Sequence, residues 1–165
     1  IGTTNMCDTA VSFPAATTLA ILWHHDHIYI HAGITSVDVR YANHTGQLHF
    51  ANPATVRHLM WNGMHHDCSQ FTHLITLTVG PVGYCNINTH TRRTADRLFH
   101  RPTERWPHLQ KLTVVHFRHG GMKLVWTKAK GYEYWRRKKA RSKWLCIKKW
   151  PYTDDFKFPD RVWDV

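Results

Sequence analysis

Several features that would mark a familiar class of enzyme or membrane protein are missing from this sequence. The four cysteines are widely separated and form no CxxC pair, which argues against a zinc ribbon or a redox motif and favours buried free thiols. No apolar run approaches the roughly 18 residues that a membrane-spanning helix needs, so no membrane span is expected. A GxxxxGK(S/T) loop and a GxSxG elbow are both absent, so neither a P-loop nucleotide site nor a serine hydrolase of that type is predicted.

Acidic residues are also scarce. Asp and Glu total 11 against 22 Lys and Arg, which gives a formal net charge of +11 and a sequence pI of about 9.8. An excess of this size favours a polyanionic partner, either nucleic acid or an anionic membrane surface. Hydrophobic residues make up 42% of the chain, which excludes a wholly disordered tail. The 165 residues suffice for one domain, or for a smaller domain with a long extension.

The positive charge is concentrated in one part of the chain. Residues 1–90 hold two strong bases and four acids, a net charge of −2, which leaves +13 for residues 91–165. Between Lys123 and Lys149 lie eleven Lys or Arg and a single acid, Glu133. The sequence therefore predicts a cationic segment joined to a nearly neutral, histidine-rich one.

Residues 1–110 predict a small mixed fold that contacts proteins. Alternating apolar residues indicate a strand or hairpin over 27–39 and a strand over 75–79. Asn52 followed by Pro53 is typical of a helix start, and an apolar face made by Val56, Leu59, Met60 and Met64 predicts that the helix continues. No internal repeat is evident.

The cationic half predicts a short helix over 94–100, a strand over 111–117 and a longer helix over 133–149 that Pro151 ends. Five large aromatics among residues 150–165 predict an ordered, extended tail. The expected fold class is therefore α+β. It comprises a mixed part (1–110) with short strands and a helix, a basic helical RNA-binding segment (111–150) and an extended aromatic tail (151–165).

Two histidine-rich clusters, His24-His25-Asp26-His27 and His65-His66-Asp67-Cys68, contain residue types that bind transition metals. A metal nuclease with an imidazole as general base is therefore an alternative function. Neither cluster has helical i, i+4 His spacing with an intervening Glu. Ordinary surface or contact histidines are the preferred interpretation, with no catalytic residue, no metal and no cofactor expected.

Large aromatics alternate with bases along the cationic segment. Lys and Arg provide phosphate contacts, while Trp and Tyr can stack on unpaired bases, a combination that suits folded RNA better than a merely solvated basic helix. The predicted RNA-binding residues are Lys123, Trp126, Lys128, Lys130, Tyr132, Trp135, Arg136, Arg137, Lys138, Lys139, Arg141, Lys143, Lys148 and Lys149.

This segment resembles a known family over residues 115–161. The matching motifs are Phe117-Arg118, Leu124-Val125-Trp126, Lys128-Ala129-Lys130-Gly131-Tyr132, Trp135-Arg136-Arg137-Lys138-Lys139, Ala140-Arg141-Ser142-Lys143, Trp150, Asp154-Asp155, Phe156 and Asp160-Arg161. They are similar to the mitochondrial form of bacterial-type large-subunit ribosomal protein thirty-five. The resemblance implies a structural constituent of the mitochondrial large ribosomal subunit, located in the matrix. Such a protein binds ribosomal RNA beside neighbouring ribosomal proteins, with residues 1–110 as an organelle-specific extension. A supernumerary subunit of another organelle assembly is the remaining alternative.

Overall fold

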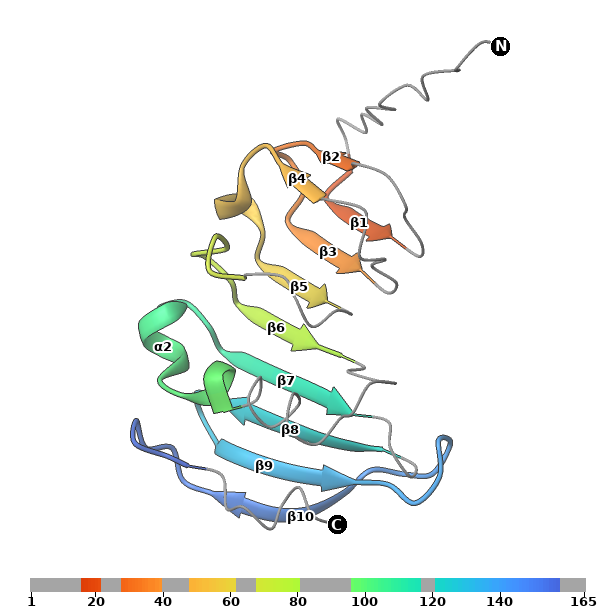
Figure 1. Ribbon diagram of the computed structural model, residues 1–165, viewed down its shortest axis with the longest axis vertical. Coiled ribbons are helices and arrows are strands. Elements are labelled where there is room, and N and C mark those ends of the chain that lie inside the picture. The colour runs from red at the N-terminus through yellow and green to blue at the C-terminus, as the bar shows by residue number, and fades with distance from the viewer. Residues whose placement is uncertain are drawn as a thin grey trace, which may run out of the picture.

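A computed structural model describes residues 16–21, 28–39, 48–61, 68–80, 96–116 and 121–157 of the chain. Most of the described residues lie in or beside an eight-stranded sheet with the order β1-β3-β5-β6-β7-β8-β9-β10 (Figure 1). Its strands are β1 (Thr18–Ile21), β3 (Ser36–Val39), β5 (His58–Trp61), β6 (Thr76–Val79), β7 (Lys111–His116), β8 (Met122–Thr127), β9 (Gly131–Arg136) and β10 (Leu145–Trp150). A second, two-stranded parallel sheet contains β2 (Ile28–Ile30) and β4 (Leu48–Phe50). The short helices include a 3-10 helix, η1 (Pro53–Thr55), and α2 (Pro102–Arg105), and residues 96–99 are also helical.

The first five strands of the large sheet are parallel and follow one another in chain order. Their register pairs Leu19 with Val37, Val37 with Leu59, Leu59 with Leu77, and Leu77 with Leu112. Successive strands are therefore 18, 22, 18 and 35 residues apart. A chain that returns to the same place after each such interval forms a solenoid, in which each coil contacts only its neighbours.

Each coil repeats one sequence pattern, in which four positions are spaced as in Phe71-x-x-Leu74-x-x-Leu77-x-Val79. The last three positions are apolar in every copy, and from the second copy onward they are buried. The copies begin at Phe13, His31, Pro53, Phe71 and Trp106, and end on the strand residues Ile21, Val39, Trp61, Val79 and Val114. The expectation that the chain has no internal repeat is therefore wrong. The unequal intervals and the mixture of apolar residue types hide the repeat from a search for a fixed period.

Backbone hydrogen bonds repeat in the same way. In four coils the N–H of the second patterned residue donates to the carbonyl of the first, over 3.0 to 3.4 Å, as Leu74 does to Phe71. One residue before each strand, a carbonyl accepts two N–H groups from the next coil. The accepting carbonyls are those of Thr17, Thr35, Arg57 and Ile75. These recurring turns align the coils and set the register of the parallel strands.

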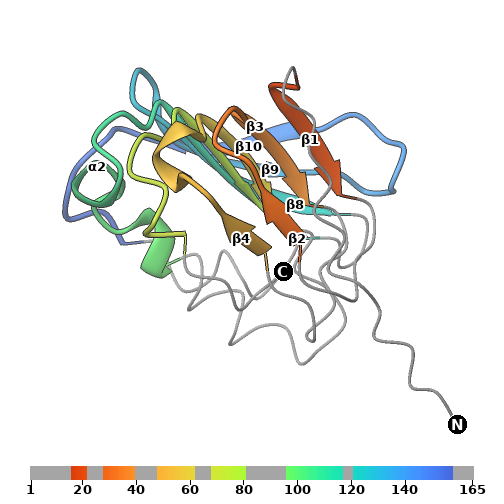
Figure 2. The same cartoon turned by 90° about the horizontal axis from the view of Figure 1, so that it is seen from above.

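The core lies on one side of the large sheet. Inward-pointing residues such as Val39, Leu77 and Leu112 are fully buried, whereas their neighbours along each strand point to the opposite face. The β2–β4 sheet forms a separate layer (Figure 2), and the ring of Phe50 packs edge-on against Phe71, with centroids 4.8 Å apart. The outward face of the parallel strands carries small polar residues, including Thr18, Ser36, Thr76 and Thr78. This one-sided burial is unlike that of a parallel sheet covered by helices on both faces.

The last four strands form an antiparallel meander that closes one end of this core. Trp126 on β8 lies opposite Tyr132 on β9, which in turn lies opposite Trp150 on β10. Trp126 and Tyr132 are completely buried. Tyr132 also donates a hydrogen bond of 3.2 Å to the Phe99 carbonyl. We call residues 121–150 the cationic cap, because they cover the apolar end of the last coil as terminal repeats do in other solenoids.

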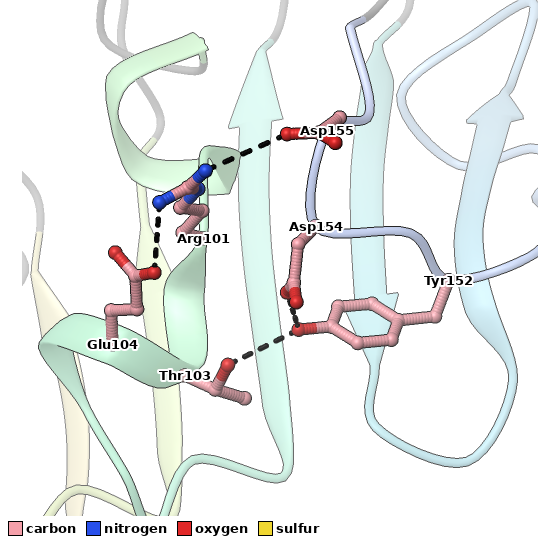
Figure 3. Close-up of polar contacts among 6 residues, drawn as sticks. All are labelled: Arg101, Thr103, Glu104, Tyr152, Asp154 and Asp155. Carbon is pink, nitrogen blue, oxygen red and sulfur yellow. Dashed lines mark hydrogen bonds and ion pairs between the residues drawn. The ribbon is translucent and has the colours of Figure 1, made fainter.

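The described part of the tail beyond the cap, residues 151–157, packs on the molecule itself. The ring of Phe156 stacks on Tyr132, with centroids 4.1 Å apart, and Tyr152 lies against Trp126 at 5.7 Å. The Tyr152 hydroxyl donates to Asp154 over 2.5 Å and lies 3.1 Å from the Thr103 hydroxyl (Figure 3). Residues 151–157 contain a turn in which the Phe156 N–H donates to the Thr153 carbonyl over 3.2 Å. Residues 158–165 lie outside the described part, so the ordered, extended tail over 151–165 stays a prediction.

Polar contacts also join the tail to α2. The Arg101 guanidinium reaches Glu104 at 3.1 Å and Asp155 at 3.6 Å (Figure 3). All three side chains are substantially exposed, so these ion pairs contribute little to stability. The aromatic contacts of Tyr152 and Phe156 therefore hold the tail in place.

The α+β expectation with a basic helix is wrong, because the described structure is mostly β. Residues 133–149 do not form one helix: they contain the end of β9, a connecting loop and most of β10. Lys, Arg and Ala favour a helix locally, but Tyr132, Tyr134 and Trp150 lie at positions where a strand buries them against partners distant in sequence. Tertiary packing therefore overrides local propensity here.

The helix predicted after Asn52 is only partly correct. The Asn52 side chain accepts a hydrogen bond from the Ala54 N–H at 3.2 Å, but it caps only the single turn of η1. The chain then enters β5, where Leu59 and Trp61 face the core. The strands predicted over 27–39, 75–79 and 111–117 are confirmed by β2, β3, β6 and β7, and residues 96–99 of the predicted short helix are helical.

Candidate polyanion interface

The cationic cap combines a dense set of exposed bases with a single buried acid. Eight of its eleven Lys and Arg side chains are exposed, and the other three, Lys123, Arg136 and Arg137, are half-buried. The exposed members are Lys128, Lys130, Lys138, Lys139, Arg141, Lys143, Lys148 and Lys149. The cap therefore presents cations to solvent without an exposed carboxylate of its own.

Glu133, the only acid of the cap, is 8% exposed and engaged through both oxygens. One carboxylate oxygen lies 3.4 Å from the Lys149 ammonium, and the other accepts a hydrogen bond of 3.2 Å from the indole N–H of Trp135. A buried carboxylate needs such partners, since desolvation without them would be costly. Glu133 thus offsets part of the cap's positive charge internally.

Cation–π contacts organise the outward face of the cap. The Lys123 ammonium lies 5.0 Å from the ring centroid of Trp135, which is directly opposite on β9, and 4.7 Å from that of Trp144. The Arg137 guanidinium lies 4.5 Å from the centroid of Trp144. Trp144 thus connects β8 to the loop after β9 by contacts that each contribute about 0.5 to 1 kcal/mol at exposed sites.

Close packing also fixes the start of this loop. Gly121 has φ +121°, and a Cβ there would lie 2.9 Å from Arg137 Nε and 3.3 Å from the Trp144 ring. The Arg137 N–H donates to the Gly121 carbonyl over 3.0 Å. Glycine therefore allows Arg137 and Trp144 to approach β8 closely, which holds the first and last residues of the basic loop against the sheet.

The electrostatic environment of Lys123 reflects this crowding. Burial lowers the pKa of Lys123, and the positive charges of Lys111 and Arg137 lower it further, while Glu133 acts in the opposite direction. Like charges near one another disfavour the protonated ammonium. Lys123 therefore lies in the repulsive field of two other cations, Lys111 and Arg137.

The structure divides the predicted RNA-binding residues into two groups. The eleven bases lie together on the cap, as exposed or half-buried side chains. The aromatics do not all share this surface: Trp126 and Tyr132 are 0% exposed, so neither can offer a ring face to an RNA base. Trp135 is half-buried and contacts Lys123. The expected stacking by Trp126 and Tyr132 is thus replaced by a role in the core.

Two residues of this surface, Lys111 and Trp144, are not among the predicted RNA-binding residues. Lys111 is the first residue of β7 and its side chain points outward, because the next residue, Leu112, points into the core. The sequence alone does not show which face of this strand is buried. Trp144 follows the basic run, and the loop geometry alone brings it back onto Lys123.

The histidine clusters provide no described metal site. Residues 24–27 and 65–67 lie outside the described residues, whereas Cys68 is buried and its carbonyl accepts a hydrogen bond of 3.2 Å from the Trp106 indole. Among residues that the structure describes, no group of three or more His, Cys, Asp or Glu is arranged to hold a metal ion. Nor does the described part contain a helix long and apolar enough to span a membrane.

Comparison with known proteins gives no indication of function. Scans against family models, curated proteins and solved structures found no match. The site is therefore interpreted from its charges and contacts.

Proposed function

We propose that this chain is a non-catalytic binding protein, a short β solenoid whose cationic cap binds the phosphate backbone of a nucleic acid. The observation that carries the proposal is the set of eight exposed bases on a cap whose only acid is buried and already paired. Neutralising phosphates with such bases releases condensed counterions, which favours binding without reading sequence.

The distribution of charge along the chain supports one-ended binding. Residues 1–90 carry a net charge of −2, whereas the cap alone carries eleven bases and one acid. A polyanion is therefore attracted to the cap and not to the first coils. With Trp126 and Tyr132 in the core, phosphate contacts outnumber possible base contacts, so we expect weak sequence preference.

A narrower proposal names ribosomal RNA of the mitochondrial large subunit as the partner. It is supported by the resemblance over residues 115–161, which includes the exposed bases Lys138, Lys139, Arg141 and Lys143. Two aromatic residues of the resembling segment, Trp126 and Tyr132, are buried in the core of the sheet and do not support RNA contact. Sedimentation of the native protein with the large ribosomal subunit after a high-salt wash is the expected result. Recovery only in the free fraction would reject this narrower proposal.

The general proposal is tested by removing bases from the cap and from elsewhere. In one variant Lys138, Lys139 and Arg141 become Gln. A control changes the same number of exposed bases outside the cap, Arg97, Arg105 and Lys157, to Gln. Affinity for a fluorescent single-stranded RNA is measured by anisotropy over a range of salt concentrations.

We expect the cap variant to bind more weakly and to have a shallower dependence of log affinity on log salt, by about 0.7 for each phosphate that the variant no longer neutralises. The control should retain most of the slope. Equal slopes for the cap variant and the unmodified protein would contradict the proposal, as would equal reductions of the slope in both variants.

A further inference from the structure

We propose that a single-stranded RNA segment crosses the outward face of β7, β8 and β9, with phosphates on Lys111, Lys123 and Arg137 and a base on Trp144. This inference rests on the proposed function and deepens it. The proposed function assigns phosphate binding to the cationic cap as a whole, and the inference assigns it to one path over the sheet.

The three bases lie along a diagonal of the sheet, because Lys111 pairs with Thr127, four residues along β8 from Lys123. Leu112 and Leu124 point into the core and are 0% and 2% exposed, so the preceding residues, Lys111 and Lys123, project from the opposite face. Lys123 lies opposite Val115 on β7 and Trp135 on β9, and Arg137 comes directly after β9. A nucleic-acid strand that follows this diagonal meets Lys111 on β7, Lys123 on β8 and Arg137 just beyond β9.

Electrostatics favour an anion at this position. The positive charges of Lys111 and Arg137 each disfavour the protonated ammonium of Lys123 and lower its pKa. The nearby carboxylate of Glu133 is occupied by Lys149 and Trp135. Neither Lys111 nor Lys123 forms an ion pair with a residue of the described part. Phosphates beside them would relieve this repulsion and replace the missing counter-charge.

The surroundings suit an extended single strand. Trp144 is half-buried and is the aromatic ring of this path, with Lys123 and Arg137 over it. Cationic tracks combined with aromatic rings are the means by which single strands are bound without sequence preference. Beyond Lys111, the outward face continues through the side chains of Thr76 and Thr78, which are short enough for a strand to pass over.

The side chains of the site are preorganised. The contacts of Trp144 with Lys123 and Arg137, and the close approach at Gly121, hold these side chains in one arrangement. Less side-chain entropy is then lost on binding than for freely moving lysines. We therefore expect Lys123 to contribute more to affinity than the exposed lysines of the same cap.

The test compares single-charge removals inside and outside the path. Lys123→Met keeps the aliphatic stem, and Lys130→Met and Lys148→Met remove the same charge from exposed positions of the cap. Binding of a fluorescent oligouridylate is measured at fixed salt, after thermal unfolding has shown that each variant folds. We expect about tenfold weaker binding for Lys123→Met, since a charge-assisted hydrogen bond is removed. The two controls should weaken binding about twofold.

Trp144 provides a second measurement. Trp144→Leu should weaken binding about tenfold by removing the stacking surface, whereas Trp144→Phe should keep most of the affinity. Disappearance of the RNA-induced quenching of tryptophan fluorescence in Trp144→Phe would support contact at this ring. Persistence of that quenching would contradict it.

The outcomes separate this inference from the function on which it rests. If RNA binds but Lys123→Met behaves like the two control variants, the path is wrong and the general cap proposal stands. If the unmodified protein binds no RNA, both are wrong. If polyglutamate displaces the oligouridylate at equal charge concentration, the surface recognises acidic protein segments and the RNA ligand is rejected.

Discussion

Gly131 provides the sharpest test of how the cap closes the solenoid. It begins β9 with φ +80°, and a Cβ at this position would collide with the Trp150 carbonyl oxygen and lie 2.6 Å from the Tyr152 nitrogen and 2.8 Å from the Pro151 carbonyl carbon. All three are backbone atoms, so no side-chain rotation can make room. Gly131→Ala must therefore strain its own backbone or push the tail away from the core.

The expected cost follows from these two effects. A non-glycine residue in an unfavourable positive-φ conformation costs about 1 to 3 kcal/mol. Overpacking against fixed neighbours adds about 1 to 3 kcal/mol. We therefore expect Gly131→Ala to lower the free energy of unfolding by about 4 kcal/mol, a large part of the roughly 5 to 15 kcal/mol of a typical domain.

Gly33→Ala is the matched control. Its Cβ would lie 2.8 Å from the His31 ring, which is the far end of a side chain that can rotate, so the expected loss is below about 1 kcal/mol. Urea unfolding followed by far-UV circular dichroism measures both variants. If Gly131→Ala is no less stable than Gly33→Ala, the backbone of residues 150–152 does not pack against Gly131 as described, and this explanation of the cap is refuted.

Two further predictions concern the core. Leu77→Ala should lower the free energy of unfolding by about 3 kcal/mol, because Leu77 is completely buried between the coils. Thr78→Ala on the outward face should change it by less than about 0.5 kcal/mol. Similar losses for the two variants in urea unfolding would contradict the assignment of the two faces. Burial raises the pKa of Tyr132 and of Tyr134 above the usual value near 10, so the folded state retains these protons at pH values where the unfolded chain loses them. The stabilisation by these protonated tyrosines is present below about pH 10, and the free energy of unfolding should decrease as the pH rises above it. Tyr132→Phe should make this decrease shallower. A Tyr132→Phe protein whose stability has the same pH profile as the unmodified protein between about pH 8 and 11 would count against this explanation.

Local patterns in the sequence determined the features that depend on neighbouring residues. Alternation of apolar residues located β3, β6 and β7, and Asn52 with Pro53 located the cap of η1. Five aromatics with two prolines predicted an extended, packed tail, of which residues 151–157 are described. The position of the eleven bases was also determined, because charge along the chain is read directly from the sequence.

Tertiary structure alone decided which of these residues face solvent. Trp126 and Tyr132 appear in the sequence among bases and resemble stacking residues, yet pairing across β8 and β9 buries both. The same pairing makes a strand of residues whose local propensity is helical, since burying Tyr132 and Tyr134 outweighs the helix preference of the surrounding Lys, Arg and Ala by several kcal/mol. Contacts between coils join residues 18 to 35 positions apart, and these intervals are too unequal to be found as a fixed period in the sequence. The repeat and the cation group of Lys111, Lys123 and Arg137 therefore emerge only when the coils are stacked.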